Sequence, residues 1–251
     1  MQFPLRLTAD LAVARFASRV CPIQFLDAAE ILHRDSNHPV SHEKTREINA
    51  SRSPVVWIGG SEPLHHAGIS HLVRAITQTG HFVFLETDGT LLRRRIHEFQ
   101  PVSRLFLTVR LESGPRSGIS KSTRTNAFEL AIEGIRAARL SGFLICAHSR
   151  VHEQTEQAAL AGLVQFAQSL DVDGIVISPA NDRSANRDTA ALQEKTAEAR
   201  KLVGSKWWES FSRLVEPVLS AVSHGRVPRN EETGATRERE THANEEGVRV
   251  A

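Results

Sequence analysis

Short apolar runs alternate with longer amphipathic segments over most of the chain. Five runs of four or five residues are almost continuously apolar, as in strands that are covered on both faces. They are residues 54–58, 82–85, 105–109, 143–147 and 174–177. Apolar residues at helical spacing predict helices over residues 69–79, 91–99, 126–140, 155–170, 189–203 and 206–222. The alternation predicts a parallel sheet that is covered by helices.

The chain before residue 54 adds one more strand and two helices. Residues 22–26 form a further strand-length run, and residues 5–20 place Leu7, Leu11 and Ala14 on one helical face. The polar stretch that follows the run is predicted to be a loop that enters a short helix at residues 41–50. About six strand–helix units favour a partial barrel over a complete one of eight units, which takes about 250 residues. We therefore predict an α/β fold, a partial parallel (βα)6 barrel, with a helix in residues 1–21 and the barrel domain in residues 22–223.

The last part of the chain, residues 224–251, has a different composition. It carries five arginines and six glutamates but almost no large apolar side chain. Such a segment buries too little surface to offset the entropy of ordering, so we expect a disordered, charged tail. The alternative is a solvated helix that forms against a partner.

Overall charge and composition exclude several classes of protein. The net charge of +2 gives no electrostatic case for binding nucleic acid or an anionic membrane. The longest apolar runs have strand length, well below the roughly 18–20 residues of a membrane-spanning helix. Arg6, Asp10, Arg15 and Arg19 interrupt any secretory signal. Two cysteines are too few for a disulfide scaffold and indicate a reducing compartment, so we expect a cytoplasmic protein.

Polar residues follow the predicted strands and are the candidates for chemistry. Ligands of parallel α/β folds bind at the carboxyl ends of the strands. The residues at these ends are Gly59 to Pro63, Glu86 to Thr90, Arg110 and Glu112, His148 to Arg150, and Ser178 to Asn181. Loops are polar in any protein, which is the simpler explanation, but the Gly59–Gly60 pair favours a site. Two glycines let the backbone approach a ligand closely, and Glu62 supplies a carboxylate for a cationic group.

The segment Val55-Val56-Trp57-Ile58-Gly59-Gly60-Ser61-Glu62-Pro63 resembles the Gly-Gly-Glu-Pro motif of the radical S-adenosylmethionine superfamily. Phe82-Val83-Phe84-Leu85-Glu86-Thr87-Asp88-Gly89-Thr90 resembles a second family segment, with Asp88 in place of the usual Asn. Ser61 is an extra residue inside the first motif. The resemblance implies a partial (βα)6 barrel that binds S-adenosylmethionine. The residues that it assigns to this ligand are Gly59, Gly60, Ser61, Glu62, Pro63, Glu86, Thr87 and Asp88. Replacing Gly60 with valine should then abolish binding and leave the fold intact.

The iron–sulfur motif of that family is missing. The family holds a [4Fe-4S] cluster with Cys-x3-Cys-x2-Cys after the first strand, because such clusters need soft, anionic thiolates. If Cys21 is taken as the first cysteine, Phe25 and Ala28 occupy the other two positions. If residues 22–26 are the first strand, which we prefer, Cys21 precedes it and the loop has no cysteine. We therefore expect no cluster and no other metal. His33, His38 and His42 are the alternative metal ligands, but their spacing matches no established motif.

Three functions remain open at this point. The first is a relative of the radical enzymes that has lost its cluster and serves as a binding, regulatory or partner subunit, with a cluster-bearing paralogue as one candidate partner. The second is an enzyme that binds S-adenosylmethionine and does chemistry without radicals. The third is an active radical enzyme whose cluster ligands come from elsewhere, such as a partner chain.

Overall fold

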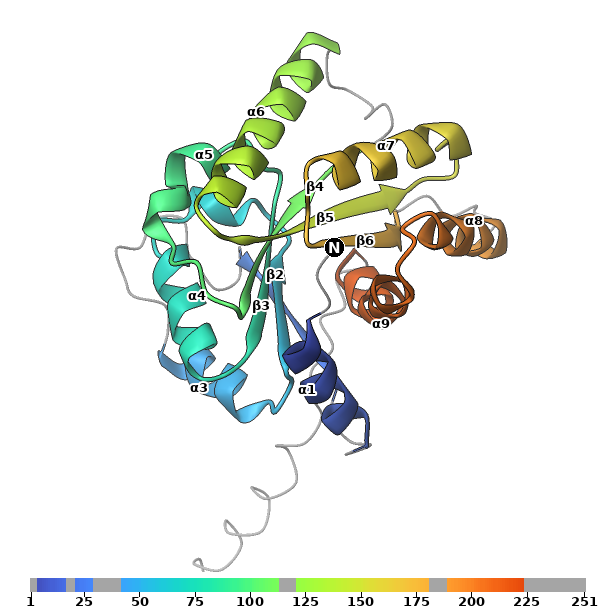
Figure 1. The fold of residues 1–251 in the computed structure, drawn as a ribbon. Helices are drawn as coiled ribbons and strands as arrows, with labels where there is room; N and C mark the ends of the chain where they lie inside the picture. Colours follow the sequence, from blue (N-terminus) through green and yellow to red (C-terminus); the bar gives the residue numbers. More distant parts are fainter. Residues whose placement is uncertain (1–3, 17–20, 29–41, 113–120, 181–188, 224–251) are drawn as a thin grey trace, which may run out of the picture.

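The computed structural model describes residues 4–16, 21–28, 42–112, 121–180 and 189–223. These residues contain six parallel strands in the order in which they occur along the chain, as expected for repeated strand–helix units. The strands are β1 (Ile23–Asp27), β2 (Val55–Gly59), β3 (Phe82–Thr87), β4 (Leu105–Arg110), β5 (Leu144–Val151) and β6 (Gly174–Pro179). The sheet is curled into a half-barrel, which confirms the predicted fold class (Figure 1). The predicted tail, residues 224–251, lies outside the described residues.

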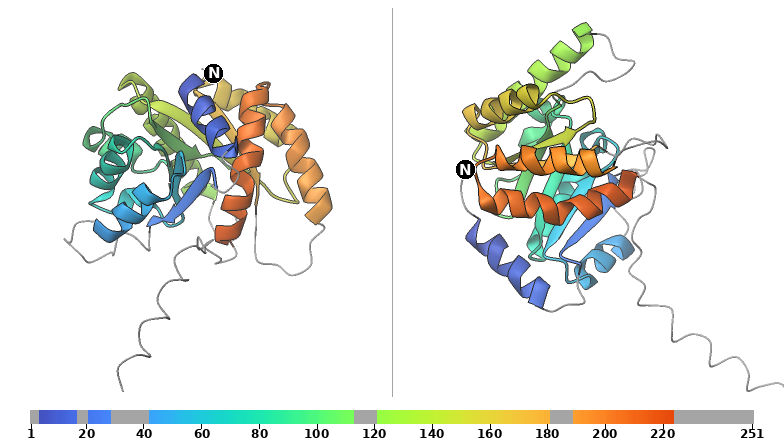
Figure 2. Two further views of the ribbon diagram at one scale, coloured as in Figure 1. Left: turned by 90° about the horizontal axis from the view of Figure 1, so that it is seen from below. Right: turned by 90° about the vertical axis from the view of Figure 1, so that its right-hand side faces the viewer.

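Helices run around the outside of the curved sheet and cross its inner face. The helical elements after β1 are α3 (His42–Ala50), η1 (Pro63–His65), α4 (Ile69–Gln78), α5 (Leu92–Arg95), η2 (Ile96–Glu98), α6 (Lys121–Leu140), α7 (Gln157–Ser169), α8 (Thr189–Lys201) and α9 (Lys206–Ser223). The N-terminal helix α1 (Leu5–Phe16) lies beside α9, as Figures 1 and 2 show. Helix α9 packs against β6 and β1, the two edge strands. It therefore closes the side of the half-barrel that two further strand units would close in a complete barrel.

Aromatic side chains fill the inner face at the level of the strand centres. Phe84 stacks between Trp57 and Phe106, with ring centroids 5.3 and 4.6 Å apart. From α9, Phe211 lies 5.0 Å from Phe84 and Trp208 lies 6.1 Å from Phe106. Trp208 and Phe211 therefore belong to the core. The aromatic layer also forms an apolar floor beneath the carboxyl ends of the strands.

Strand β5 and the helix predicted after β3 differ from the sequence prediction in ways that affect the site. Strand β5 continues to Val151, so His148 and Arg150 lie within the strand rather than after it. Both residues are still paired with β6. Their polar side chains are tolerated inside the strand because each has a polar partner within the fold. The helix predicted over residues 91–99 is a single turn, α5, followed by the 3-10 turn η2. Gln100 precedes Pro101, which disfavours a helical conformation there, and Phe99 is already extended.

Gly174, the first residue of β6, lies directly against the indole of Trp208. A Cβ atom at this position would lie 2.1 Å from the nearest indole carbon, far inside van der Waals contact. We expect Gly174→Ala to lower the free energy of unfolding by about 3 kcal/mol, because Trp208 must leave its packed position. Urea denaturation measures this change.

Gly162 provides the matched control for that substitution. It lies within α7, and a Cβ atom there would meet nothing within 4 Å. Gly162→Ala should therefore stabilise the protein by up to about 1 kcal/mol. Equal effects of the two substitutions would contradict the packing of Trp208 on β6.

Candidate functional site

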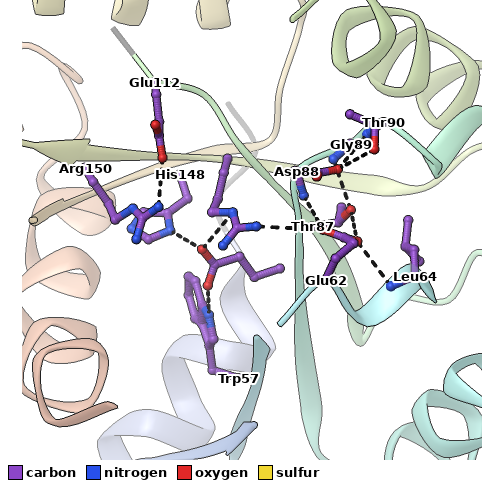
Figure 3. A network of polar contacts seen from close by, with 12 residues as sticks. Trp57, Glu62, Leu64, Thr87, Asp88, Gly89, Thr90, Glu112, His148 and Arg150 are labelled. Atoms are coloured by element: carbon purple, nitrogen blue, oxygen red, sulfur yellow. Dashed lines mark hydrogen bonds and ion pairs between the residues drawn. The ribbon is translucent and has the colours of Figure 1, made fainter. Parts of the chain in front are cut away.

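The two motif segments meet at the carboxyl ends of β2 and β3, and the Glu62 carboxylate joins them. Its Oε1 accepts hydrogen bonds from the Thr87 hydroxyl at 2.6 Å and the Leu64 amide at 3.1 Å. Its Oε2 accepts a hydrogen bond from the Asp88 amide at 2.8 Å (Figure 3). Burial and, to a smaller extent, the charge of Asp88 raise the pKa of Glu62, although these hydrogen bonds partly oppose the shift. Both oxygens are engaged within the protein, so the structure supports a role for this side chain in fixing the two loops relative to each other.

Gly59 and Gly60 make room for carboxylates of the protein itself. A Cβ atom on Gly59 would lie 2.9 Å from Oε2 of Glu86, and one on Gly60 would lie 2.5 Å from Oδ1 of Asp27. Gly60 also has a φ of 84°, which side chains rarely adopt. Replacing Gly60 with valine would therefore strain the loop itself, so a loss of binding in this variant would not by itself report on a contact with the ligand.

A second polar chain runs across the inner face, through Glu86 of β3. Its Oε2 accepts a hydrogen bond from the Trp57 indole at 2.8 Å, and its Oε1 lies 3.1 Å from Nδ1 of His148. Nε2 of His148 lies 2.9 Å from the hydroxyl of Ser178. All four residues are buried, and they come from four strands, β2, β3, β5 and β6. The register explains this convergence, because alternate residues of adjacent parallel strands face the same side.

Glu86 is ionised under ordinary conditions despite its burial. Burial opposes ionisation of this carboxyl, but the charge and hydrogen bond of His148, the charge of Arg110 and the indole of Trp57 outweigh it. Together they lower the pKa of Glu86 to about 2. A buried carboxylate with these partners is a fixed negative charge at the centre of the strand ends.

Two arginines lie beside this chain. Arg110 ends β4, with its Nε 3.7 Å from Glu86 and one terminal nitrogen 3.8 Å from Glu62. Arg150 of β5 donates a hydrogen bond to Glu112 at 2.8 Å. Within the described part of the chain, the Nε atom of each arginine is buried and has no hydrogen-bond partner. Buried donors without a hydrogen bond are rare in proteins, although the Nε of Arg110 keeps its ion pair with Glu86.

The described side chains give this edge of the sheet a negative balance. The carboxylates of Asp27, Glu62, Glu86, Asp88 and Glu112 outnumber the guanidinium groups of Arg110 and Arg150. Among the described side chains, this edge therefore attracts positively charged groups more than negative ones.

The structure brings together most of the residues that the sequence singled out. Glu62 is hydrogen-bonded to Thr87 and Asp88, Gly59 lies against Glu86, and Gly60 lies against Asp27. Ser61 is exposed, and Pro63 begins η1. Trp57 and Asp27 were missed as members of the site. Trp57 lies in an apolar run, and an indole in such a run is usually part of the core. The one signal of its place in the site is that it lies two residues before Gly59, so both residues are on the same face of the strand.

The cysteines do not fit a [4Fe-4S] cluster of the usual kind, which takes three thiolates. Cys21 precedes β1, and its thiol donates to the carbonyl of Ile23 at 3.0 Å. Cys146 is fully buried in β5, and burial raises the pKa of its thiol. The segment after β1 contains no cysteine, and His33 and His38 lie in it, outside the described residues. The structure thus agrees with the second of the two alignments, in which Cys21 comes before the first strand.

The described helices include none that is long and apolar enough to cross a membrane. The same residues also contain no group of three or more His, Cys, Asp or Glu side chains that could hold a metal ion.

Part of the chain matches a known protein family. The family model of the Radical SAM superfamily matches residues 42–151, which hold both motif segments and β2 to β5. Residues 42–151 match the radical SAM domain. Among solved structures, Streptococcus suis SuiB bound to S-adenosylmethionine superposes with a TM-score of 0.55 at 11% identity, covering 78% of this chain and 48% of that one. At this identity the likeness concerns the fold.

Two curated relatives are GTP 3′,8-cyclases. The chain is 28% identical over 157 residues to GTP 3′,8-cyclase 2 of Pseudomonas aeruginosa, covering 61% of this chain and 47% of the relative. It is 28% identical over 171 residues to the probable GTP 3′,8-cyclase of Pyrobaculum aerophilum, covering 66% and 48%. The chain spans about half the length of these curated relatives.

Proposed function

We propose that this radical SAM-like domain binds S-adenosylmethionine, or a similar adenosine-containing cation, without generating radicals. The proposal rests on a contrast between the two motif loops, which are held together, and the cluster ligands, which are too few. The loops after β2 and β3 are joined by Glu62, whereas the chain offers two cysteines where the cluster takes three. The domain then serves as a binding or regulatory subunit, and a cluster-bearing protein is the partner that we propose for it.

The charge at the strand ends supports this class of ligand. S-adenosylmethionine carries a sulfonium, an ammonium and a carboxylate, so its net charge is positive. The excess of carboxylates at the strand ends favours the two cationic groups. The Nε of Arg110 has no hydrogen-bond partner among the described residues, so it can donate to the carboxylate, and charge-assisted bonds of this kind are among the strongest that a side chain makes.

Titration calorimetry tests the proposal. S-adenosylmethionine should bind to the whole chain, and S-adenosylhomocysteine, which lacks the sulfonium charge, should bind more weakly. Arg110→Gln should weaken S-adenosylmethionine binding by about tenfold or more, which corresponds to the loss of one charge-assisted hydrogen bond.

Arg93→Gln is the matched control. Arg93 pairs with Glu133 at 2.7 Å on the surface, where its side chain is 66% exposed, and its loss should leave binding unchanged. If the unaltered protein shows no binding at millimolar ligand, the binding part of the proposal is wrong.

A further inference from the structure

We propose that Ser178 is a nucleophile activated by His148 and Glu86, able to accept a small acyl group from an ester. The three side chains form a hydroxyl–imidazole–carboxylate chain across β6, β5 and β3, with links of 2.9 and 3.1 Å. Nucleophile, base and orienting group at hydrogen-bond distance from one another are the geometric mark of a covalent catalyst, whatever the fold that carries them. This activity needs neither S-adenosylmethionine nor an iron–sulfur cluster.

The Glu86 carboxylate determines which nitrogen of His148 carries the proton. The Glu86 carboxylate accepts a hydrogen bond from Nδ1 of His148, so an imidazole with a single proton carries it on Nδ1. Nε2 then has its lone pair directed at the Ser178 hydroxyl and accepts its proton. The Trp57 indole fixes the second oxygen of Glu86, so the carboxylate cannot turn away from the imidazole. His148 is thus held as a base toward Ser178 and toward no other described side chain.

Arg150 supplies the positive group that such a reaction needs. It is the register partner of Ser178, so the two residues lie side by side on adjacent strands, about 5 Å apart between their Cα atoms. Its buried Nε lacks a hydrogen-bond partner among the described residues, although a terminal nitrogen is held by Glu112. An oxyanion that forms next to Ser178 would give this donor its acceptor.

The reaction balances without a cofactor. The Ser178 oxygen attacks the ester carbonyl carbon, its proton passes to Nε2 of His148, and the carbonyl electron pair moves to the oxygen beside Arg150. The C–O bond of the ester then breaks, the leaving alkoxide takes the proton from Nε2, and an O-acyl serine remains. Water, deprotonated by His148 in the same way, releases the acid and restores Ser178. Ser178 is only 2% exposed, so we expect acetyl-sized rather than long acyl groups.

Labelling with methanesulfonyl fluoride, a serine-reactive probe of about acetyl size, tests the proposal on the full chain. The Ser178 oxygen should form a bond to sulfur with loss of fluoride, and peptide mass spectrometry should place the label on Ser178. Ser178→Ala should abolish labelling, and His148→Gln should slow it by at least 100-fold, which is typical of a lost general base. The matched control is Ser149→Ala, since Ser149 is the buried neighbour on the opposite face of β5 and should not affect labelling.

Two results would overturn the proposal. One is the absence of label on Ser178 in the unaltered protein after prolonged exposure, which does not depend on whether any variant folds. The other is an unchanged labelling rate in a folded His148→Gln protein, which would show that the imidazole does not act as the base. Neither result bears on calorimetric binding of S-adenosylmethionine, so the two proposals fail separately.

Discussion

Glu86→Ala is expected to destabilise the protein by about 4 kcal/mol, since it removes one partner from a buried, charged network. The substitution leaves the Trp57 indole without an acceptor and leaves Arg110 and His148 without their central carboxylate. Urea denaturation at neutral pH measures the loss. The matched control is Glu133→Ala, which breaks an exposed ion pair with Arg93 and should cost less than about 1 kcal/mol.

The dependence of stability on pH provides a second measure of the same carboxylate. The pKa of Glu86 is about 2 in the folded protein, against an ordinary value of 4.5. A lowered carboxyl pKa stabilises the folded state above the unfolded pKa, and this contribution disappears as the pH falls from 4.5 toward 2. The contribution amounts to about 3 kcal/mol at neutral pH. Glu86→Gln should lack this part of the acid dependence; a variant that loses stability between pH 5 and pH 3 as steeply as the unaltered protein would contradict the assignment.

Anaerobic reconstitution with iron and sulfide is expected to leave the protein colourless, with well under one cluster per chain. Under strong reductant the reconstituted protein should form no 5′-deoxyadenosine from S-adenosylmethionine. The physical reason is the ligand count. The cluster takes three thiolates, the chain has two, and the thiol of Cys146 is fully buried with a raised pKa. Hard or neutral side chains in place of thiolates bind iron–sulfur clusters weakly.

A radical enzyme with the complete cysteine motif, reconstituted in parallel, controls for the procedure. A brown protein with about four irons and four sulfides per chain that produces 5′-deoxyadenosine would contradict the proposed function and favour an active enzyme with unusual ligands. Formation of the cluster only in a mixture with a partner protein would identify the partner as the source of the missing ligands.

The local order of strands and helices follows from the sequence with little ambiguity. Runs such as Val55–Gly59 are apolar at every position because both faces of a parallel strand are covered. Helix α4 follows with one apolar face and ends before Gly80, as its spacing predicts. The ends of β3 and β5 were predicted too early. Glu86 and His148 are polar, and a polar residue inside a buried strand is tolerated only where another part of the chain supplies a partner.

The sequence by itself determined the fold class, the order of the strands and the motif residues after β2 and β3. It also determined the shortage of thiolates, because a count of cysteines does not depend on how the chain folds. Tertiary structure alone decided that Glu62 is a link between two loops, and that Gly59 and Gly60 give room to Glu86 and Asp27. It also decided that Ser178, His148 and Glu86, up to 92 positions apart along the chain, form one hydrogen-bonded chain. Such contacts depend on strand register and on the face to which each side chain points, and these are fixed only when distant strands pair in space.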